Sequence, residues 1–593
     1  MRRTLANQTS GPSGLADYWR VGIVASWFLF AVLMLIVRAP DIAALTLVDT
    51  DDNLRLAQVR ALLDGQGWYD LRQYRLAAPI GADIHWSRLP DLPIAGLILL
   101  MRPFLGAAAE NWAVAIAPLL PLGLGLAALS LIVRRLVDPR AWPIAVLLTP
   151  CALGLLSMWA PLRIDHHGWQ LALLALAIAG LVDANKRRGG MTSGIATALS
   201  FAIGLEMLLY LAMIGAIAAL FWIRDRGEAP RLAAYGAVLG GGTALGFALF
   251  ASEANRAPVC DALSPVWLSV LAIAGAALVL VALLSPAGWR ARLGLAAIAG
   301  AILIAGFALV WPDCLSRPEG TSSELAAVWL DNVREARPLH VQDWRAVLAL
   351  LAMPLSGAVG YTLALRRSRG SDDFYRWLAV AALALASFAL LFWQMRLGPG
   401  MQMLFIPGAV ALAWHWIRKI RASPSAAVRI FGTVGALILI TGIYMALPIA
   451  AFPKAEDAVA EAREEIADQC PTAEALAPVA ARPPATIFTP IDLGPRLIVM
   501  TPHSAVAGPY HRNEAAILDV FHAFQRPPDQ ARAIIARRTA DYVMICQGIS
   551  GERHFGAEDE ASLMHALIAG EAPGWLEPVT LPEGSPFRLW RVR

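Results

Sequence analysis

Charged side chains are scarce in this sequence, because Asp, Glu, Lys and Arg make up only 16% of its 593 residues. Hydrophobic residues make up 58%, and the mean hydropathy is +0.56. A soluble chain this apolar would not stay in solution, so the composition excludes the soluble globular classes. The net charge is only +4, with Lys and Arg in short loop clusters, and we expect no nucleic-acid partner. The composition predicts a polytopic protein of the lipid bilayer.

The sequence also lacks a tandem repeat and a small-residue cleavage site after its first apolar run, residues 21–37. Arg2, Arg3 and Arg20 precede this run, so we expect an uncleaved first span with a cytoplasmic start. Residues 93–105 are too short and Pro-flanked for a confident span, and we expect a re-entrant or amphipathic segment there.

Long apolar runs recur over the first three quarters of the chain, and basic clusters close alternate loops. The total is about thirteen spans, an odd number that places the C-terminal part outside. The expected spans are residues 21–37, 112–133, 142–159, 169–182, two within 191–223 that divide near Gly204, 233–250, 266–284, 293–311, 344–365, 377–392, 401–416 and 430–447.

We therefore expect an α-helical transmembrane domain over residues 1–452 and a small periplasmic α/β domain over residues 453–593. The periplasmic loops of the first domain are expected at about 41–93, 160–168, 253–265 and 312–343. In the second domain, residues 471–484 have the Ala/Pro composition of a linker. The pattern after it predicts strands at 485–488, 496–500 and 542–546 and helices at 513–524 and 528–537.

The five cysteines agree with this orientation. Cys260 and Cys314 lie in expected periplasmic loops, Cys470 and Cys546 lie in the outer domain, and Cys151 lies inside a span. Two disulfides are expected in an oxidising compartment, although spacing leaves their connectivity open. The expected location is a bacterial inner membrane.

Acidic side chains gather in three of the outward loops. L-V-D-T-D-D at residues 47–52 places three carboxylates within four residues, and such a group repels itself unless a cation joins it. R-I-D-H-H-G-W at 163–169 and D-N-V-R-E-A-R-P at 331–338 lie on the same expected side. Carboxylates suit Mg²⁺ or Mn²⁺, and Mn²⁺ also accepts imidazole, so one metal site built from three loops is predicted. The alternatives are solvated acids at helix ends, an interfacial histidine pair and a surface Glu335.

These motifs resemble, in the same order, those of the catalytic subunit of oligosaccharyltransferase, a membrane-embedded GT-C glycosyltransferase. V-D-T-D-D-N-L-R at 48–55 is similar to the first acidic motif of that family at Asp49, Asn53 and Arg55. A-P-I-G at 78–81 resembles its Y-P-L-G segment. D-H-H at 165–167 corresponds to the second acidic motif, and N-V-R-E-A-R-P at 332–338 places Glu335 on the glutamate of the third.

Two further segments extend the resemblance toward the C-terminus. W-Q-M-R-L at 393–397 is similar to the segment that carries the family's donor-phosphate arginine, which falls on Arg396. T-P-I-D-L-G-P-R-L at 489–497 looks like a degraded W-W-D-Y-G motif that keeps Asp492 and Gly494. Pro490 and Ile491 replace the two tryptophans that grip the acceptor in that family, so we do not expect an Asn-x-Ser/Thr acceptor.

The resemblance implies a metal-dependent transfer of a sugar or glycan from a polyprenyl (di)phosphate donor to a periplasmic protein, lipid or polysaccharide. The alternative within the same class is a single sugar moved from polyprenyl monophosphate to a lipid or polysaccharide. A transporter, with Glu206 as its intramembrane acid, and a scaffolding protein are the other classes considered.

The resemblance and the acid pattern together give a set of expected site residues. The expected catalytic residues are Asp49, Asp165 and Glu335; the expected ligands of Mg²⁺ or Mn²⁺ are Asp49, Asp165, His167 and Glu335; and Arg396 is expected to bind the donor phosphate. Candidate acceptor or sugar contacts are Asp51, Asp52, His85, His166, Asp492, Tyr510, His511 and Arg512.

Overall fold

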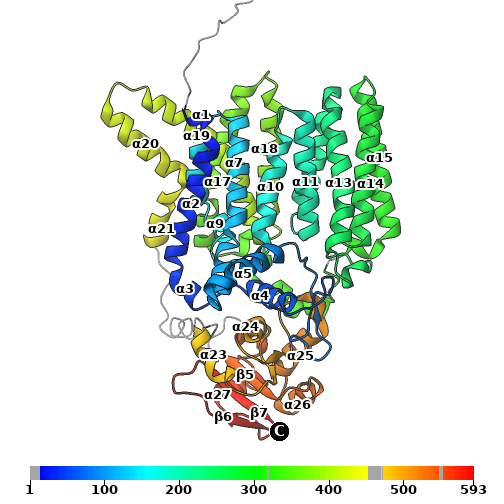
Figure 1. The fold of residues 1–593 in the computed structure, drawn as a ribbon, viewed down its shortest axis with the longest axis vertical. Coiled ribbons are helices and arrows are strands. Elements are labelled where there is room, and N and C mark those ends of the chain that lie inside the picture. Colours follow the sequence, from blue (N-terminus) through cyan, green and yellow to red (C-terminus); the bar gives the residue numbers. More distant parts are fainter. Residues whose placement is uncertain (1–13, 317–318, 452–468, 471, 547–551) are drawn as a thin grey trace, which may run out of the picture.

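The computed structural model describes residues 14–316, 319–451, 469–470, 472–546 and 552–593. A bundle of long helices is followed by a smaller α/β domain that lies against one end of the bundle (Figure 1). The helices α4 (Thr50–Leu63) and α5 (Asp91–Leu105) lie between the two (Figure 1). We call this end of the bundle the domain-facing end.

Each of the thirteen predicted apolar stretches contains a helix, which confirms the polytopic helical fold. The bundle helices are α2 (Trp19–Val37), α6 (Ala108–Ile116), α7 (Leu119–Leu136), α8 (Trp142–Leu148), α9 (Leu153–Ser157), α10 (His167–Leu181), α11 (Lys186–Ile203), α12 (Leu208–Arg224), α13 (Ala229–Phe250), α14 (Pro265–Leu284), α15 (Trp289–Val310), α17 (Trp344–Ser368), α18 (Asp373–Leu390), α19 (Gly398–Arg421), α20 (Ala426–Thr441) and α21 (Ala446–Ala451).

Fewer than the thirteen expected spans are found when helices are judged by length and composition alone. Eight helices in the described ranges are long and apolar enough to cross a membrane, or nine if the pair at 426–441 and 443–451, bent by 66°, is one span. The helices α10 and α12 are apolar but shorter, and α11 begins with three basic residues. The predicted division of residues 191–223 is present, since α11 ends at Ile203 and α12 begins at Leu208.

The helix α19 forms the centre of the bundle: 78% of the 18-residue apolar stretch in its span is buried inside the protein, whereas none of the corresponding stretch of α15 is. Close packing of α17 on α19 depends on glycine. A Cβ atom on Gly360 would lie 1.8 Å from the carbonyl oxygen of Gly408, so any larger residue would push the two helices apart. Small residues at such crossings are the usual means by which membrane helices gain contact area.

The first outward loop forms a folded layer rather than a flexible connection. It contains α3 (Ala39–Ala43), α4, the antiparallel pair β1 (Arg72–Gln73) and β2 (Ala82–Asp83), and α5. The helix α5 is absent from the candidate spans, as expected for residues 93–105, and it lies across the domain-facing end (Figure 1).

The C-terminal domain is built on a mixed five-stranded sheet of order β4-β3-β5-β7-β6. The strands are β3 (Thr486–Phe488), β4 (Ser504–Ala505), β5 (Tyr542–Cys546), β6 (Leu576–Val579) and β7 (Phe587–Val592). β3 pairs in parallel with β4 and β5, and β7 is antiparallel to both β5 and β6. The helices α23 (Ala473–Ala480), α24 (Gly494–Met500), α25 (Glu514–Gln525), α26 (Pro528–Arg537) and α27 (Leu563–Ala569) accompany the sheet.

Two sequence predictions in this domain are wrong. Residues 496–500 form the last five of the seven residues of α24 rather than a strand. Pro495 lies in the first turn and favours a helix, and burial on all sides removes any periodicity that would distinguish the two. Part of the expected linker at 471–484 is α23, whose start is capped by Thr472. The expected domain boundary near residue 452 lies beside residues 452–468, outside the described part.

The outer parts are joined covalently and by a shared core. Both expected disulfides, Cys260–Cys314 and Cys470–Cys546, are present, and Cys151 is free. One hydrophobic cluster combines residues of the first outward loop with residues of the C-terminal domain. It contains Leu54, Leu76, Ile84 and Trp86 from the loop and Ile487, Leu497 and Tyr510 from the domain, among others.

Candidate functional site

The acidic motif at residues 49–52 starts the helix α4. Asp49 occupies the N-cap position, and its carboxylate accepts a hydrogen bond from the backbone N–H of Thr50 at 2.6 Å. Asp52 in the first turn is fully buried, and its Oδ1 accepts from the backbone N–H of Asp165 at 2.8 Å. Carboxylates are favoured at this end of a helix by the exposed N–H groups. The hydrogen bond between Asp52 and the backbone of Asp165 shows that the predicted first and second acidic loops meet.

Arg163 binds the carboxylates of both loops. Its guanidinium lies 2.6 Å from Asp49, 3.2 Å from Asp52 and 3.3 Å from Asp165. Burial opposes the charge of this side chain, but the three carboxylates outweigh burial and raise the pKa of Arg163. The second acidic motif contains Arg163, but the sequence predicted no role for it. The only signal in the sequence is an arginine two residues before an acid.

The second acidic motif forms a compact group. Ligand atoms of Asp165, His166 and His167 all lie within 4.8 Å of one another. His167 Nδ1 contacts Asp165 Oδ2, and its imidazole is 29% exposed. Burial disfavours the charge on Asp165, but the imidazoles of His167 and His166 hold its pKa well below the usual value. Asp165 is therefore an ionised carboxylate with an accessible imidazole at its side.

Glu206 joins this group, although sequence reasoning considered it as the intramembrane acid of a transporter. It lies in the break between α11 and α12, and its Oε1 is 2.8 Å from His166 Nε2. Gln170 donates to its other oxygen at 2.6 Å. Burial would lower the pKa of His166, but Asp165 and Glu206 raise it to about 10. Helix periodicity could not reveal this contact, because it joins the start of α10 to the break between α11 and α12.

Asp51 is the member of the group that lacks a partner. Among the described residues it forms no hydrogen bond and no ion pair, although it is half-buried. Burial raises the pKa of Asp51 well above its usual value, and the nearby charges of Asp165 and Asp49 raise it further. An unpaired carboxylate between like charges must take up a proton or a cation. Oxygen donors from Asp49, Asp51 and Asp165 beside the imidazole of His167 fit a divalent metal ion in donor type.

A buried arginine, Arg55, takes part in the contacts that position His166. Arg55, on α4, forms an ion pair with Asp91 at 2.6 Å, and both side chains are fully buried. Its guanidinium lies over the ring of Trp86, 4.7 Å from the centroid. The ring of Trp86 in turn lies 5.5 Å from that of His166. These contacts fix the position of His166.

The C-terminal domain contributes a further acid and a tyrosine. Asp492 lies in η10 (Ile491–Leu493) and is in contact with solvent on one side. Protein atoms surround the rest of its carboxyl group, and this partial loss of water, together with the charge of Asp49, raises the pKa of Asp492 to about 6. The hydroxyl of Tyr510 donates to the backbone carbonyl of Thr50 at 3.1 Å. Both residues therefore lie beside the start of α4.

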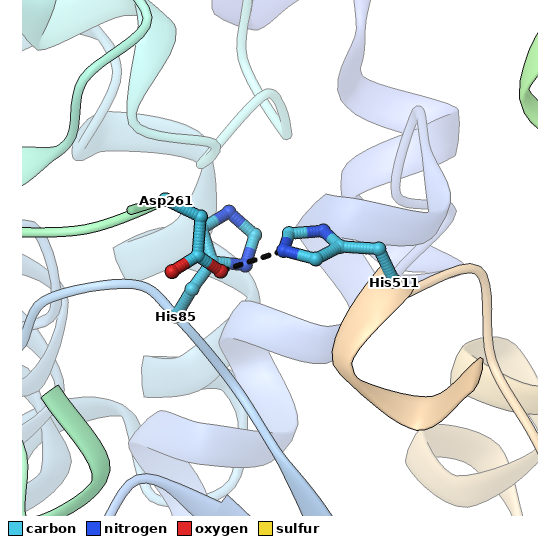
Figure 2. A group of neighbouring side chains, drawn as sticks. All are labelled: His85, Asp261 and His511. Carbon is cyan, nitrogen blue, oxygen red and sulfur yellow. Dashed lines mark hydrogen bonds and ion pairs between the residues drawn. The ribbon is translucent and has the colours of Figure 1, made fainter. Parts of the chain in front are cut away.

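His85, His511 and Arg512 surround an acid that sequence reasoning did not single out, Asp261. Its carboxylate lies 2.6 Å from His511 Nε2 and accepts from Arg512 Nε at 2.8 Å and Nη2 at 2.7 Å. The ring of His85 lies beside this carboxylate and faces His511 (Figure 2). Burial and the neighbouring His511 lower the pKa of His85, so its imidazole is neutral.

The structure does not bring Glu335 and Arg396 into this group. Glu335, in η6 (Arg334–Ala336), is exposed and forms no hydrogen bond or ion pair with any described residue. Arg396, in η8 (Met395–Leu397), is exposed and donates to Gln394 at 2.8 Å. The two segments contact each other, since the N–H of Met395 donates to the carbonyl of Arg337 at 3.0 Å.

No protein-family model and no curated protein sequence matches this chain. Solved structures of the Archaeoglobus fulgidus oligosaccharyltransferase do match. The apo form has a TM-score of 0.68 at 16% identity, over 95% of this chain and 73% of that one. The complex with an inhibitory peptide and a dolichol-phosphate has a TM-score of 0.66 at 14% identity, over 98% and 75%. The complex with Zn and sulfate has a TM-score of 0.58 at 14% identity, over 95% and 72%. The chain therefore shares the fold of this oligosaccharyltransferase, which confirms, at the level of the fold alone, the resemblance found in its motifs.

Proposed function

We propose that this protein is a metal-dependent glycosyltransferase that takes a sugar or glycan from a polyprenyl-phosphate-linked donor. The observation that carries the proposal is that Asp49 and Asp165 share the guanidinium of Arg163 and that Asp165 also contacts His167, at the domain-facing end of a membrane bundle. The unpaired Asp51 lies close enough for the charges of Asp165 and Asp49 to raise its pKa. The oligosaccharyltransferase with this fold has been solved with a dolichol-phosphate, and another of its structures contains Zn and sulfate.

In this proposal Asp49, Asp165 and His167 hold a divalent ion of the Mg²⁺ or Mn²⁺ class, and Asp51 joins them. When bound, such an ion would neutralise the charge that develops on the leaving phosphate. Arg163 holds the carboxylates of α4 and of the second loop at a fixed separation, so the ligands need not reorganise. His166 keeps its proton, adds positive charge beside the phosphate position and is oriented by Glu206.

Glu335 and Arg396 enter the proposal as the donor side of the site. Both are exposed on two short segments that contact each other. A guanidinium binds two phosphate oxygens at once, which an ammonium cannot do, so Arg396 is assigned to the donor phosphate. Glu335 is assigned to binding the metal and the acceptor. This role requires its segment to lie over α4.

The acceptor is proposed to be a hydroxyl of a protein, lipid or polysaccharide rather than an Asn-x-Ser/Thr sequon. Pro490 and Ile491 supply no indole N–H at the position of the family's tryptophans. Asp492 remains there with a pKa raised to about 6, which suits a group that accepts a proton near neutral pH. Transfer of one sugar from polyprenyl monophosphate stays the alternative, and a bacterial inner membrane stays the proposed location.

The test measures release of polyprenyl phosphate from a bacterial lipid extract by the purified protein in nanodiscs. We expect release that EDTA abolishes and Mn²⁺ restores, and we expect Asp49→Ala and Asp165→Asn to lower it by about 100-fold or more. Asp313→Asn is the matched control, because Asp313 is an exposed acid of another outward loop. Release that is insensitive to EDTA, or that persists in the Asp49→Ala Asp165→Asn double variant, would reject the proposal.

A further inference from the structure

A second group of metal-ligand side chains lies where three separate parts of the chain meet. His85 follows β2 in the first outward loop, Asp261 lies in the loop before α14, and His511 begins η11 (His511–Asn513) of the C-terminal domain. One ligand atom of each lies within 4.8 Å of those of the other two. Figure 2 shows the two imidazoles and the carboxylate turned toward a common point.

His85 is the unexplained member of this group. Its imidazole is half-buried and forms no hydrogen bond with any described residue, although its backbone carbonyl accepts from Asn255 at 3.1 Å. The ring centroid lies 4.7 Å from that of His511, and the two planes are tilted by 45°. An imidazole with restricted access to water normally has a partner for its ring nitrogens. Here the nearest polar atoms in the group are a carboxylate oxygen and a second imidazole nitrogen, which are metal ligands themselves.

Asp261 is held in place from both sides. The preceding residue, Cys260, is joined to Cys314 by a disulfide, and its carbonyl accepts from the indole N–H of Trp267 at 2.8 Å. Arg512 donates two hydrogen bonds to the Asp261 carboxylate and keeps it ionised. Carboxylate ligands of metals are commonly held by such an outer hydrogen-bond donor.

We propose that His85, Asp261 and His511 bind a transition-metal ion of the Zn²⁺ class and thereby tie the C-terminal domain to the first outward loop. Two imidazoles and one carboxylate are a ligand set that Zn²⁺ takes in proteins, with water in the remaining position. On binding, His511 Nε2 presents its lone pair to the ion, so a proton on that nitrogen is lost to solvent and the neutral ring keeps its proton on Nδ1. The Asp261 oxygen that His511 contacts then becomes a ligand. Arg512 keeps its bond to the other oxygen of Asp261, Oδ1.

This site shares no residue with the proposed active site, so it does not depend on the proposed function. Its ligands come from three segments that are 176 and 250 residues apart along the chain, as the positions 85, 261 and 511 show. The ion would act as a crosslink between segments that otherwise depend on side-chain packing. Its contribution would appear as stability of the assembled protein rather than as a chemical step.

The experiment uses the full-length protein in detergent with His167→Ala, which removes a ligand of the proposed active site. The protein is stripped with EDTA and titrated with Zn²⁺ alone, and bound zinc and thermal unfolding are measured. We expect one Zn²⁺ per chain and a rise in Tm. We expect His511→Gln and Asp261→Asn each to weaken binding by about 100-fold or more and to abolish the rise in Tm.

His522→Gln is the matched control, because His522 also pairs with an acid across elements, Glu324 at 2.8 Å, but has no third ligand. It should leave zinc binding unchanged. If the ligand variants fail to fold, Co²⁺ replaces Zn²⁺ in the His167→Ala protein, and visible absorption bands of a four- or five-coordinate site support the proposal. Zinc binding that is equally strong in His511→Gln and Asp261→Asn, or Co²⁺ without such bands, overturns it.

Discussion

Arg163 shows how a single side chain organises the proposed active site. Its guanidinium is shared among three carboxylates from two outward loops, and it is itself only 10% exposed. Burial raises the pKa of Asp52 to about 7, with Arg163 opposing the rise and the charges of Asp165 and Asp49 adding to it. Removal of Arg163 would leave the buried carboxylate of Asp52 without a counter-charge and would leave buried Asp165 with only its two imidazoles.

We predict that Arg163→Met lowers the free energy of unfolding by about 3–5 kcal/mol, because it leaves buried charges uncompensated. Adding Asp52→Asn should recover part of this loss, since one of those charges is then absent. Thermal unfolding of both single variants and of the double variant in the same detergent measures the coupling. Strictly additive losses would show that Arg163 and Asp52 do not depend on each other.

At the same scale, Glu206 is predicted to act through His166. Glu206→Gln removes one of the two negative charges, the other being Asp165, that hold the imidazole of His166 protonated. Polyprenyl phosphate release should therefore fall by about 10- to 100-fold, as for other outer partners of a site. Tm is recorded in parallel to show that the variant is folded.

Glu324→Gln serves as the control, because Glu324 also contacts a histidine, His522, but on the exposed surface of the C-terminal domain. Full turnover in Glu206→Gln would remove Glu206 from the site.

At the scale of elements, the helix and strand bounds predicted from the sequence are most accurate where turn residues and hydrophobic pattern favour the same element as the packing. The expected helix at 528–537 and the expected strand at 542–546 match α26 and β5 at both ends, since Pro528 starts the helix and the strand is a continuous buried apolar run. The pattern at 496–500 is also apolar after Arg496, but there Pro495 and contact with α4 select a helix. The long membrane helices were found because length alone identifies them.

Asp183 lies in the turn between α10 and α11, at the end of the bundle that is far from the C-terminal domain. It connects the helix ends there. Its carboxylate accepts from Arg135 at 2.7 Å and twice from Arg188 at 2.8 Å. Burial opposes the charge, but the hydrogen bonds from Arg188 and the backbone of Asn185 and the charge of Arg135 lower the pKa of Asp183 below its usual value. One carboxylate thus joins three helices.

We predict that Asp183→Asn lowers Tm at pH 7 and that the difference from the wild type closes in acid. A carboxyl whose pKa is lower in the folded than in the unfolded state stabilises the protein above the ordinary Asp pKa, about 3.9, and this stabilisation disappears as the pH falls through the folded-state value.

Thermal unfolding between pH 7 and pH 3 measures this closure, with Asp138→Asn as the control. Asp138 pairs with Arg140, which is 50% exposed, so its loss should have little effect. A Tm difference for Asp183→Asn that stays constant with pH would contradict the role of the charge.

At the scale of the whole molecule, the two domains share one apolar cluster and form a continuous structure around the site. Arg75 of the first loop donates to the carbonyl of His503, and Arg60 of α4 donates to the carbonyl of Val499. Arg496 donates to the carbonyl of Leu45 at 2.7 Å. The C-terminal domain is therefore part of the support of α4 and its acids.

We predict that the chain without its C-terminal domain, residues 14–451, is not a stable monomer in detergent. Leu76, Ile84 and Trp86, all nearly fully buried, would face water rather than lipid, and exposed apolar patches of this kind cause association. Size-exclusion chromatography should show aggregates where the full chain elutes as a single species. A monodisperse truncated protein would show that the first outward loop folds without the domain.

Sequence reasoning predicted the site only in part, for a physical reason. Asp49 and Asp165 were found because acids beside long apolar runs are unusual, and their loops do meet. Glu206 and Asp261 were not assigned to a site, because each lies in a short break or loop without a recognisable motif. Their partners are 40 and 250 residues away along the chain. Such contacts follow from how the helices pack, and periodicity within one helix carries no information about them.

The long separation of these contacts has a consequence for biosynthesis. The start of α4 emerges from the ribosome early, but Arg496 and Tyr510, which hold it from the other side, are made more than 400 residues later. An interrupted translation product would carry the acids without their support and so, under the proposed function, could not consume lipid-linked sugar. Activity in the cell would therefore begin only with the finished polypeptide.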